Sequence, residues 1–124
     1  MSQKTVLYVE DNAFNRKIVR QLLGSTTYRL LEATDGAQGV KTAIDSKPDV
    51  ILMDIQLPNL SGLDATHRLR QDPATAHIPI IVVTSFAQSG DELKAQEAGA
   101  SAYLAKPYSP RELLALIRKF APEA

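Results

Sequence analysis

Polar residues that can do chemistry stand at the ends of four apolar runs in this 124-residue sequence. Glu10 and Asp11 follow the first run, Asp54 ends the third, and Thr84 and Lys106 follow the fourth and fifth. Three carboxylates held close together repel one another, so one takes up a proton at neutral pH unless a hard cation such as Mg²⁺ neutralises them. A cation, an ammonium group and a hydroxyl also suit a phosphate, which Asp54 would attack to form an acyl phosphate. These residue types indicate phosphoryl chemistry, provided that the fold brings them together.

Five short apolar runs, rich in β-branched residues, are expected to be strands. They are residues 6–9, 29–31, 50–53, 80–83 and 102–105. The segments between and after them have helical spacing. Phe14, Ile18 and Leu22 recur every four residues in the first helix, with Val19 and Leu23 beside them, and Gly24 is expected to end it. Ser109 with Glu112 predicts a capping box at the start of the last helix.

Similar start signals stand before the three middle helices, at Asp35, Ser61 and Ser89. Proline follows Lys47 and Asp72, and should stop two helices before the next strands. Strands that alternate with helices predict an α/β fold with a parallel sheet and helices on both faces. The carboxyl ends of such strands lie at one edge, where open α/β sheets bind ligands. Periodicity alone leaves the strand order open.

The overall composition favours one soluble domain and excludes several other classes of protein. Lys plus Arg and Asp plus Glu both number 14, so no net charge points to nucleic acid or to an anionic membrane. The absence of cysteine removes disulfides and thiolate metal sites. The apolar runs are far shorter than the roughly 20 residues that span a bilayer. We therefore expect a cytoplasmic protein in which residues 1–124 form a single domain with no output domain.

Four motifs carry a resemblance to a known family. "YVEDN", "LMDIQLPNLSG", "IPIIVVTSFA" and "AYLAKPYS" occur in the order and spacing of the receiver domain of two-component response regulators. The likeness covers essentially the whole chain, and it is greatest to single-domain regulators of the DivK type. It implies the CheY-like, flavodoxin-like fold, a (β/α)5 arrangement with strand order 2-1-3-4-5, which places the first and third strands side by side.

The resemblance also implies the roles of the acidic residues. Asp54 would accept a phosphoryl group from a histidine kinase or a histidine phosphotransfer protein. Asp11, Asp54 and the backbone carbonyl of Gln56 would bind Mg²⁺, with Glu10 assisting through water. Lys106 would pair with the phosphoryl group, and its bond to Pro107 would be cis.

Other residues would report or tune the phosphorylated state. By the resemblance, Thr84 and Tyr103 form the switch pair, in which the hydroxyl moves toward the phosphate and the ring turns inward. Gln56 and Phe86 lie where the rate of self-dephosphorylation is tuned, and Ser85 stands where the family commonly has alanine. The product of the switch would be a changed surface around the fourth helix, fifth strand and fifth helix, which a downstream effector protein would read.

The presumed fourth helix, residues 89–98, has few apolar anchors. Leu93, Ala95 and Ala98 are its only apolar residues. Such a helix packs lightly. Light packing fits a surface that shifts with phosphorylation, and it fits a plain exposed helix equally well.

Less specific interpretations compete with this hypothesis. Asp54 could only mark a strand end, Asp11 could only cap a helix, and His67 and His77 are interpreted as surface residues. The chain could be a phosphate shuttle or sink in a relay, a receiver-like module that is never phosphorylated, or a receiver from a longer hybrid kinase. A phosphatase of the haloacid-dehalogenase type is disfavoured, because Gln56 stands where such an enzyme needs a second aspartate as general acid. We therefore expect a signalling phosphoacceptor and not a conventional enzyme.

Overall fold

The computed structural model describes residues 3–84 and 90–123. Strands and helices alternate along the chain, as the sequence predicts. The strands are β1 (Thr5–Val9), β2 (Arg29–Ala33), β3 (Val50–Asp54), β4 (Ile80–Thr84) and β5 (Ala102–Ala105). The helices are α1 (Ala13–Leu23), α2 (Gly36–Ser46), α3 (Gly62–Gln71), α4 (Asp91–Ala98) and α5 (Pro110–Phe120).

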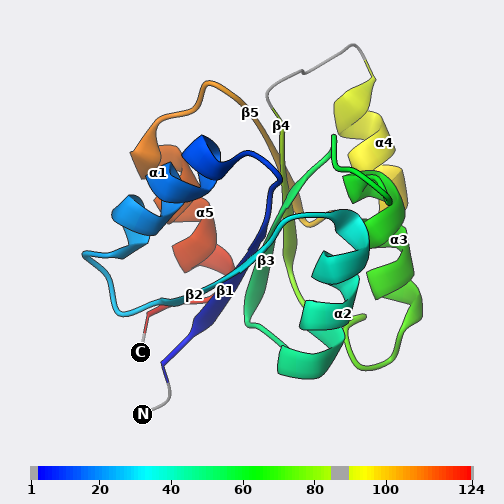
Figure 1. The fold of residues 1–124 in the computed structure, drawn as a ribbon, viewed down its shortest axis with the longest axis horizontal. Coiled ribbons are helices and arrows are strands. Elements are labelled where there is room, and N and C mark those ends of the chain that lie inside the picture. The colour runs from blue at the N-terminus through cyan, green and yellow to red at the C-terminus, as the bar shows by residue number, and fades with distance from the viewer. Residues whose placement is uncertain (1–2, 85–89, 124) are drawn as a thin grey trace.

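The five strands form one parallel sheet in the order β2-β1-β3-β4-β5, which confirms the flavodoxin-like prediction. Helices α1 and α5 cover one face of this sheet, and α2, α3 and α4 cover the other (Figure 1). The pairing of β1 with β3 sets Val9 opposite Met53, so the residues that follow them emerge side by side. All the strand ends that carry the candidate site residues therefore meet at one edge.

The alternation of side chains along the strands divides the interior into two layers. Val6 and Tyr8 of β1 pack with Leu52 of β3 in the layer beneath α1 and α5. Leu7 and Val9 pack in the layer beneath α2, α3 and α4. Because both faces are covered, β3 and β4 are buried at every position.

Most helix ends agree with the sequence signals. Asp35, Ser61 and Ser109 each accept a hydrogen bond from a backbone N–H in the first turn of their helix, and Ser109 forms the expected capping box with Glu112. Helix α4 differs, because it begins at Asp91 after Gly90, which provides no side-chain cap. Ser89, the expected cap, lies outside the described residues.

Helix α1 buries only part of its predicted apolar stripe. Val19 and Leu23 are buried, whereas the side chains of Phe14 and Ile18 are 69% and 44% exposed. Gly24 follows the helix as expected, although its backbone stays right-handed. His67 and His77 are exposed, as predicted. Within residues 3–84 and 90–123, no helix has both the length and the apolar character needed to cross a bilayer.

Candidate functional site

Asp54 is the last residue of β3, the central strand of the sheet, and its side chain is 8% exposed. It shares the strand parity of Val50 and Leu52, which face the layer beneath α1 and α5. The backbone N–H of Gln56 donates to Asp54 Oδ1 over 3.3 Å. A rigid strand that is covered on both faces therefore holds this carboxylate at the edge of the sheet.

Helix α3 packs directly against the backbone of Asp54. The N–H of Gly62 donates to the carbonyl oxygen of Ile55 over 2.8 Å. A Cβ atom on Gly62 would lie 1.7 Å from the carbonyl oxygen of Asp54, so this close approach requires glycine. The start of α3 thus fixes the main chain on either side of the aspartate.

Glu10 continues β1 by one residue, with its backbone N–H donating to Ala33 over 2.9 Å. Its side chain is 1% exposed and accepts several hydrogen bonds. Tyr8 Oη and Asn15 Nδ2 donate to Oε1 over 3.1 and 3.2 Å. The Asn12 N–H donates to Oε2 over 3.3 Å. This buried carboxylate is therefore fixed in position by the polar groups around it.

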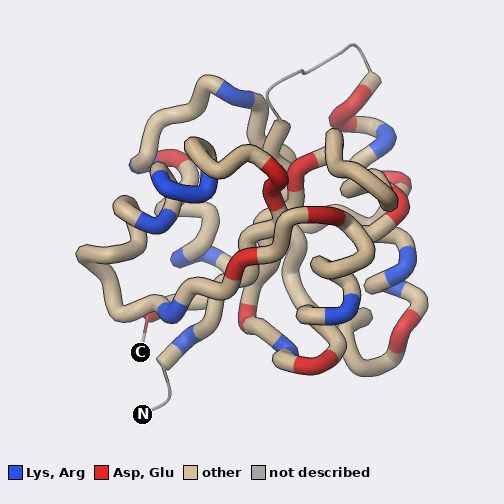
Figure 2. Tube along the Cα trace, in the orientation of Figure 1, with Lys and Arg blue, Asp and Glu red and all other residues tan. Residues whose placement is uncertain are grey.

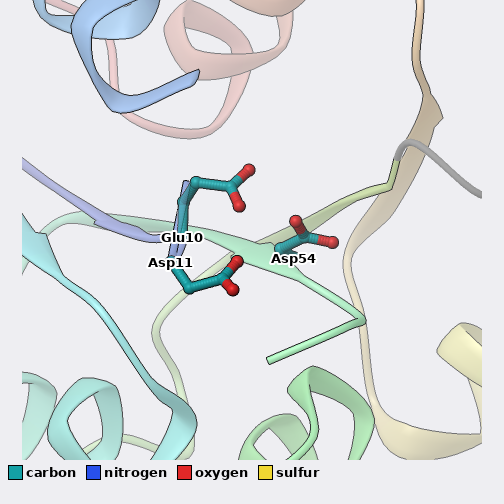
Figure 3. Close-up of side chains that lie close together, drawn as sticks. All are labelled: Glu10, Asp11 and Asp54. Carbon is teal, nitrogen blue, oxygen red and sulfur yellow. The ribbon is translucent and has the colours of Figure 1, made fainter. Parts of the chain in front are cut away.

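Asp11 is exposed and stands beside Glu10 and Asp54. One carboxylate oxygen from each of the three residues lies within 4.8 Å of the other two, and Figure 3 shows the side chains gathered above the ends of β1 and β3. Asn12, and not Asp11, caps α1, since its side chain accepts from the Asn15 N–H. Asp11 therefore has no capping role, and the three acids match the oxygen ligands of a small hard cation.

Lys106 reaches the same site from the end of β5. Its Nζ lies 2.7 Å from Glu10 Oε1 and 3.8 Å from Asp54 Oδ2. Its backbone N–H donates to the carbonyl of Thr84 over 2.7 Å, and its bond to Pro107 is cis. The ammonium group therefore partly offsets the acidic cluster, and it contacts Glu10 more closely than Asp54.

The pKa values of the two buried acids, Asp54 and Glu10, shift in opposite directions. Burial, and then the hydrogen bond with Glu10 and its charge, raise the pKa of Asp54 from 3.8 to about 7. Burial is the largest influence on Glu10 and acts to raise its pKa. The hydrogen bond and charge of Lys106, with the hydrogen bonds of Asp54 and Asn12, together outweigh burial and lower that pKa. Near neutral pH the metal-free pair therefore holds a proton chiefly on Asp54, as expected for crowded carboxylates.

Thr84 and Tyr103 lie on the other side of the sheet from Asp54. Thr84 is buried at the end of β4 and shares its parity with Ile80 and Val82, which face α3 and α4. Tyr103 is half-buried against that same layer. The proposed switch residues therefore occupy the layer that contains α4.

The acids open into a cleft at the sheet edge. Gln56 is exposed there, and the cleft is also lined by Asn12, Asn15 and Ser61. Phe86 and Ser85, which the sequence placed near the phosphate, lie outside the described residues. Figure 2 shows acidic positions where β1 and β3 end, while Lys and Arg are spread over several helices.

Sequence reasoning missed three donors to Glu10. Tyr8, Asn15 and Arg16 bind its side chain or its carbonyl oxygen, the last over 2.9 Å. Tyr8 reads as an ordinary core residue of an apolar strand. Tyr8 stands two residues before Glu10, and alternate residues of a strand point to the same face of the sheet. This spacing was the sequence signal that the Tyr8 hydroxyl could contact Glu10.

A buried aspartate beside two further acids and a lysine stands at the carboxyl edge of an open parallel sheet, which is where such sheets bind ligands. The family model of the response regulator receiver domain matches residues 6–118. The chain belongs to that family.

Relatives of known name and structure agree with this assignment. The polar-differentiation response regulator DivK of Brucella anthropi is 40% identical over 121 residues, which cover 98% of each chain. The receiver domain of a sensor histidine kinase from Pseudomonas aeruginosa is 36% identical, with a TM-score of 0.88, over 96% of this chain and 98% of that one. That relative has a magnesium ion coordinated in its active-site cleft. A putative response regulator from Chloroflexus aurantiacus is 28% identical, with a TM-score of 0.90, over 96% and 98% of the two chains.

Proposed function

We propose that this chain is a single-domain response regulator, a phosphorylation switch in which Asp54 is the phosphoacceptor. The supporting observation is the Asp54 carboxylate, held at the end of β3 within 4.8 Å of acid oxygens of Glu10 and Asp11 and 3.8 Å from Lys106. An Asp54 oxygen attacks phosphorus of a phosphohistidine on a histidine kinase or histidine phosphotransfer protein. The P–N bond breaks, and the imidazole nitrogen keeps the electron pair.

Asp11 and Asp54, with the backbone carbonyl of Gln56, would hold Mg²⁺, and Glu10 would assist through water. The donor set fits, because hard carboxylate oxygens of three acids lie close together in a cleft that Gln56 also lines. When bound, Mg²⁺ supplies positive charge that offsets the acids and the phosphoryl oxygens. Lys106 contributes a second positive charge, and the rigid end of β3 orients Asp54 for in-line attack.

The test is intact-protein mass after incubation with Mg²⁺ and acetyl phosphate, for the natural chain and for Asp54→Asn. We expect the natural chain to gain one phosphoryl group, and the gain to disappear with a chelator or with the variant. An unmodified natural chain would overturn this function and favour a receiver-like module that is never phosphorylated. Return of the phosphoryl group to a histidine phosphotransfer protein would instead identify a shuttle or a sink.

The surface beside the site suits a protein donor. Phe14 and Ile18 are exposed on α1, and Ile18 also lines a hollow together with Pro107 and Tyr108. Exposed apolar patches rimmed by polar residues mark protein interaction sites, and Ile18 lines the same hollow as Lys106. Phe14→Ser should slow transfer from the protein donor and leave the reaction with acetyl phosphate unchanged. Equal slowing with both donors would contradict this docking surface.

The output surface would comprise α4, β5 and α5. Only Asp91 and Ala95 of α4 are buried, and Leu93 is 59% exposed, so this helix is lightly held. Phosphorylation would draw Thr84 toward the phosphate and Tyr103 further inward, and a cytoplasmic effector protein would bind the changed face. Chemical shifts on adding beryllofluoride and Mg²⁺ should change in α4 and β5. Changes confined to the site would contradict this surface.

A further inference from the structure

Tyr8 lies completely buried beneath the site and is not explained by packing alone. It points from β1 into the layer under α1 and α5, on the same side as Glu10. Its hydroxyl donates to Glu10 Oε1 over 3.1 Å. A carboxylate can only accept in such a contact, so the phenol hydroxyl of Tyr8 is the donor.

Glu10 Oε1 has two other donors, and one of them is expected to leave. Lys106 Nζ lies 2.7 Å away and Asn15 Nδ2 3.2 Å away. Lys106 Nζ is 3.8 Å from Asp54 Oδ2, so in this state it belongs to Glu10. Under the proposed function, Lys106 must turn toward the new phosphoryl group on Asp54. Glu10 Oε1, on a side chain that is 1% exposed, then loses its shortest contact.

We infer that Tyr8 is a positioning residue that keeps Glu10 hydrogen-bonded while Lys106 moves to the phosphoryl group. The inference rests on the proposed function. A buried charged acceptor that loses a donor is destabilised strongly unless another donor remains. Tyr8 and Asn15 remain, so Lys106 can be released at lower cost. Without the Tyr8 hydroxyl, Glu10 depends more on Lys106 and holds it more tightly.

The test uses Tyr8→Phe, which removes one oxygen and leaves the ring in place. We expect phosphorylation by acetyl phosphate at saturating Mg²⁺ to slow roughly ten- to a hundredfold, the range set by one hydrogen bond to a charged group. The Mg²⁺ dissociation constant, measured by calorimetry, should change less than twofold. A general loosening of the site would lower both the phosphorylation rate and the affinity for Mg²⁺. A slower rate with unchanged Mg²⁺ affinity therefore distinguishes a positioning role from a structural one.

Tyr28→Phe is the matched control. Tyr28 is also buried in the layer under α1 and α5, but its hydroxyl donates to the carbonyl of Ala121, away from the acids. This variant should lose a buried hydrogen bond and keep the natural rate of phosphorylation. If it slows the reaction as much as Tyr8→Phe does, the effect is one of general stability and the inference fails.

Asn15→Ala provides a second variant at the same oxygen, on a half-exposed side chain whose loss leaves the core intact. It should slow the reaction in the same direction by a smaller factor, and it decides the matter if Tyr8→Phe does not fold. Unchanged rates in both variants would refute the role of Tyr8 while leaving the proposed function in place. A natural chain that takes no phosphoryl group would overturn both.

Discussion

Replacing Asp54 by asparagine should stabilise the metal-free protein, and the gain should grow as pH rises. Asparagine has the shape of a protonated aspartate but cannot ionise. The pKa of Asp54 is raised from 3.8 to about 7 by burial and by Glu10. The folded state therefore binds a proton that the unfolded state releases between these pH values, and the stability of the natural chain falls as pH rises through them.

The size of the gain follows from the same shift. A pKa of about 7 instead of 3.8 corresponds to at most ~4 kcal/mol of penalty on the ionised form. Cleft water and the Lys106 ammonium, 3.8 Å away, screen part of it. We expect Asp54→Asn to raise the free energy of unfolding by about 2 kcal/mol at pH 8.5. The difference should nearly vanish below pH 4.

Urea denaturation followed by circular dichroism, in the presence of a chelator, measures this difference at each pH. Titrating groups other than Glu10, which interacts with Asp54, are common to both proteins and their contributions cancel. Asp45→Asn, on an exposed residue near the end of α2, is the matched control and should stay within about 0.5 kcal/mol of the natural chain. A gain that is absent at pH 8.5, or that increases as pH falls, would refute the account of a crowded acid pair.

Three further changes test how the site and its supports are built. Gly62→Ala should destabilise the protein by about 3 kcal/mol, because its Cβ would meet the Asp54 carbonyl oxygen at 1.7 Å; an unchanged urea midpoint would show that α3 can move away freely. Ser109→Ala removes a complete capping box and should cost ~1 kcal/mol by thermal unfolding, whereas a loss too small to measure would mean that water replaces the cap. Arg70→Ala removes a guanidinium that donates to the Gly99 carbonyl over 2.8 Å, so amide exchange at the end of α4 should accelerate roughly tenfold; an unchanged exchange rate there would contradict its role as a brace.

The alternation of apolar runs with helical spacing was enough to predict the α/β fold and the edge at which the acids meet. Strand order was beyond periodicity, because the β2-β1-β3-β4-β5 arrangement depends on which crossovers pack, and it came only with the family resemblance. Which part of the apolar stripe of α1 is buried was also beyond it. Phe14 and Ile18 have helical spacing, but only contact with the sheet decides that Val19 is the covered neighbour.

The residue types in the sequence indicated which side chains would lie near the site better than they indicated which of those side chains would contact one another. The acids and Lys106 were found because their charge contrasts with the apolar runs before them. Lys106 pairs with Glu10 at 2.7 Å and lies farther from Asp54. This preference depends on burial and on competing donors, which the sequence does not reveal. The hydroxyl of Tyr8 went unnoticed because a tyrosine in a strand is usually a packing residue.

The alternation of side chains along the strands places the acidic site residues and the predicted switch residues on different sides of the sheet. Glu10 and Asp54 share the side of α1, whereas Thr84 and Tyr103 share the side of α4. The proposed output surface spans both layers, because α4 faces the side of Tyr103 whereas α5 shares its layer with α1. Duplicated copies can therefore diverge in output through α4 alone, whereas a change on α5 lies in the layer that also holds the acids.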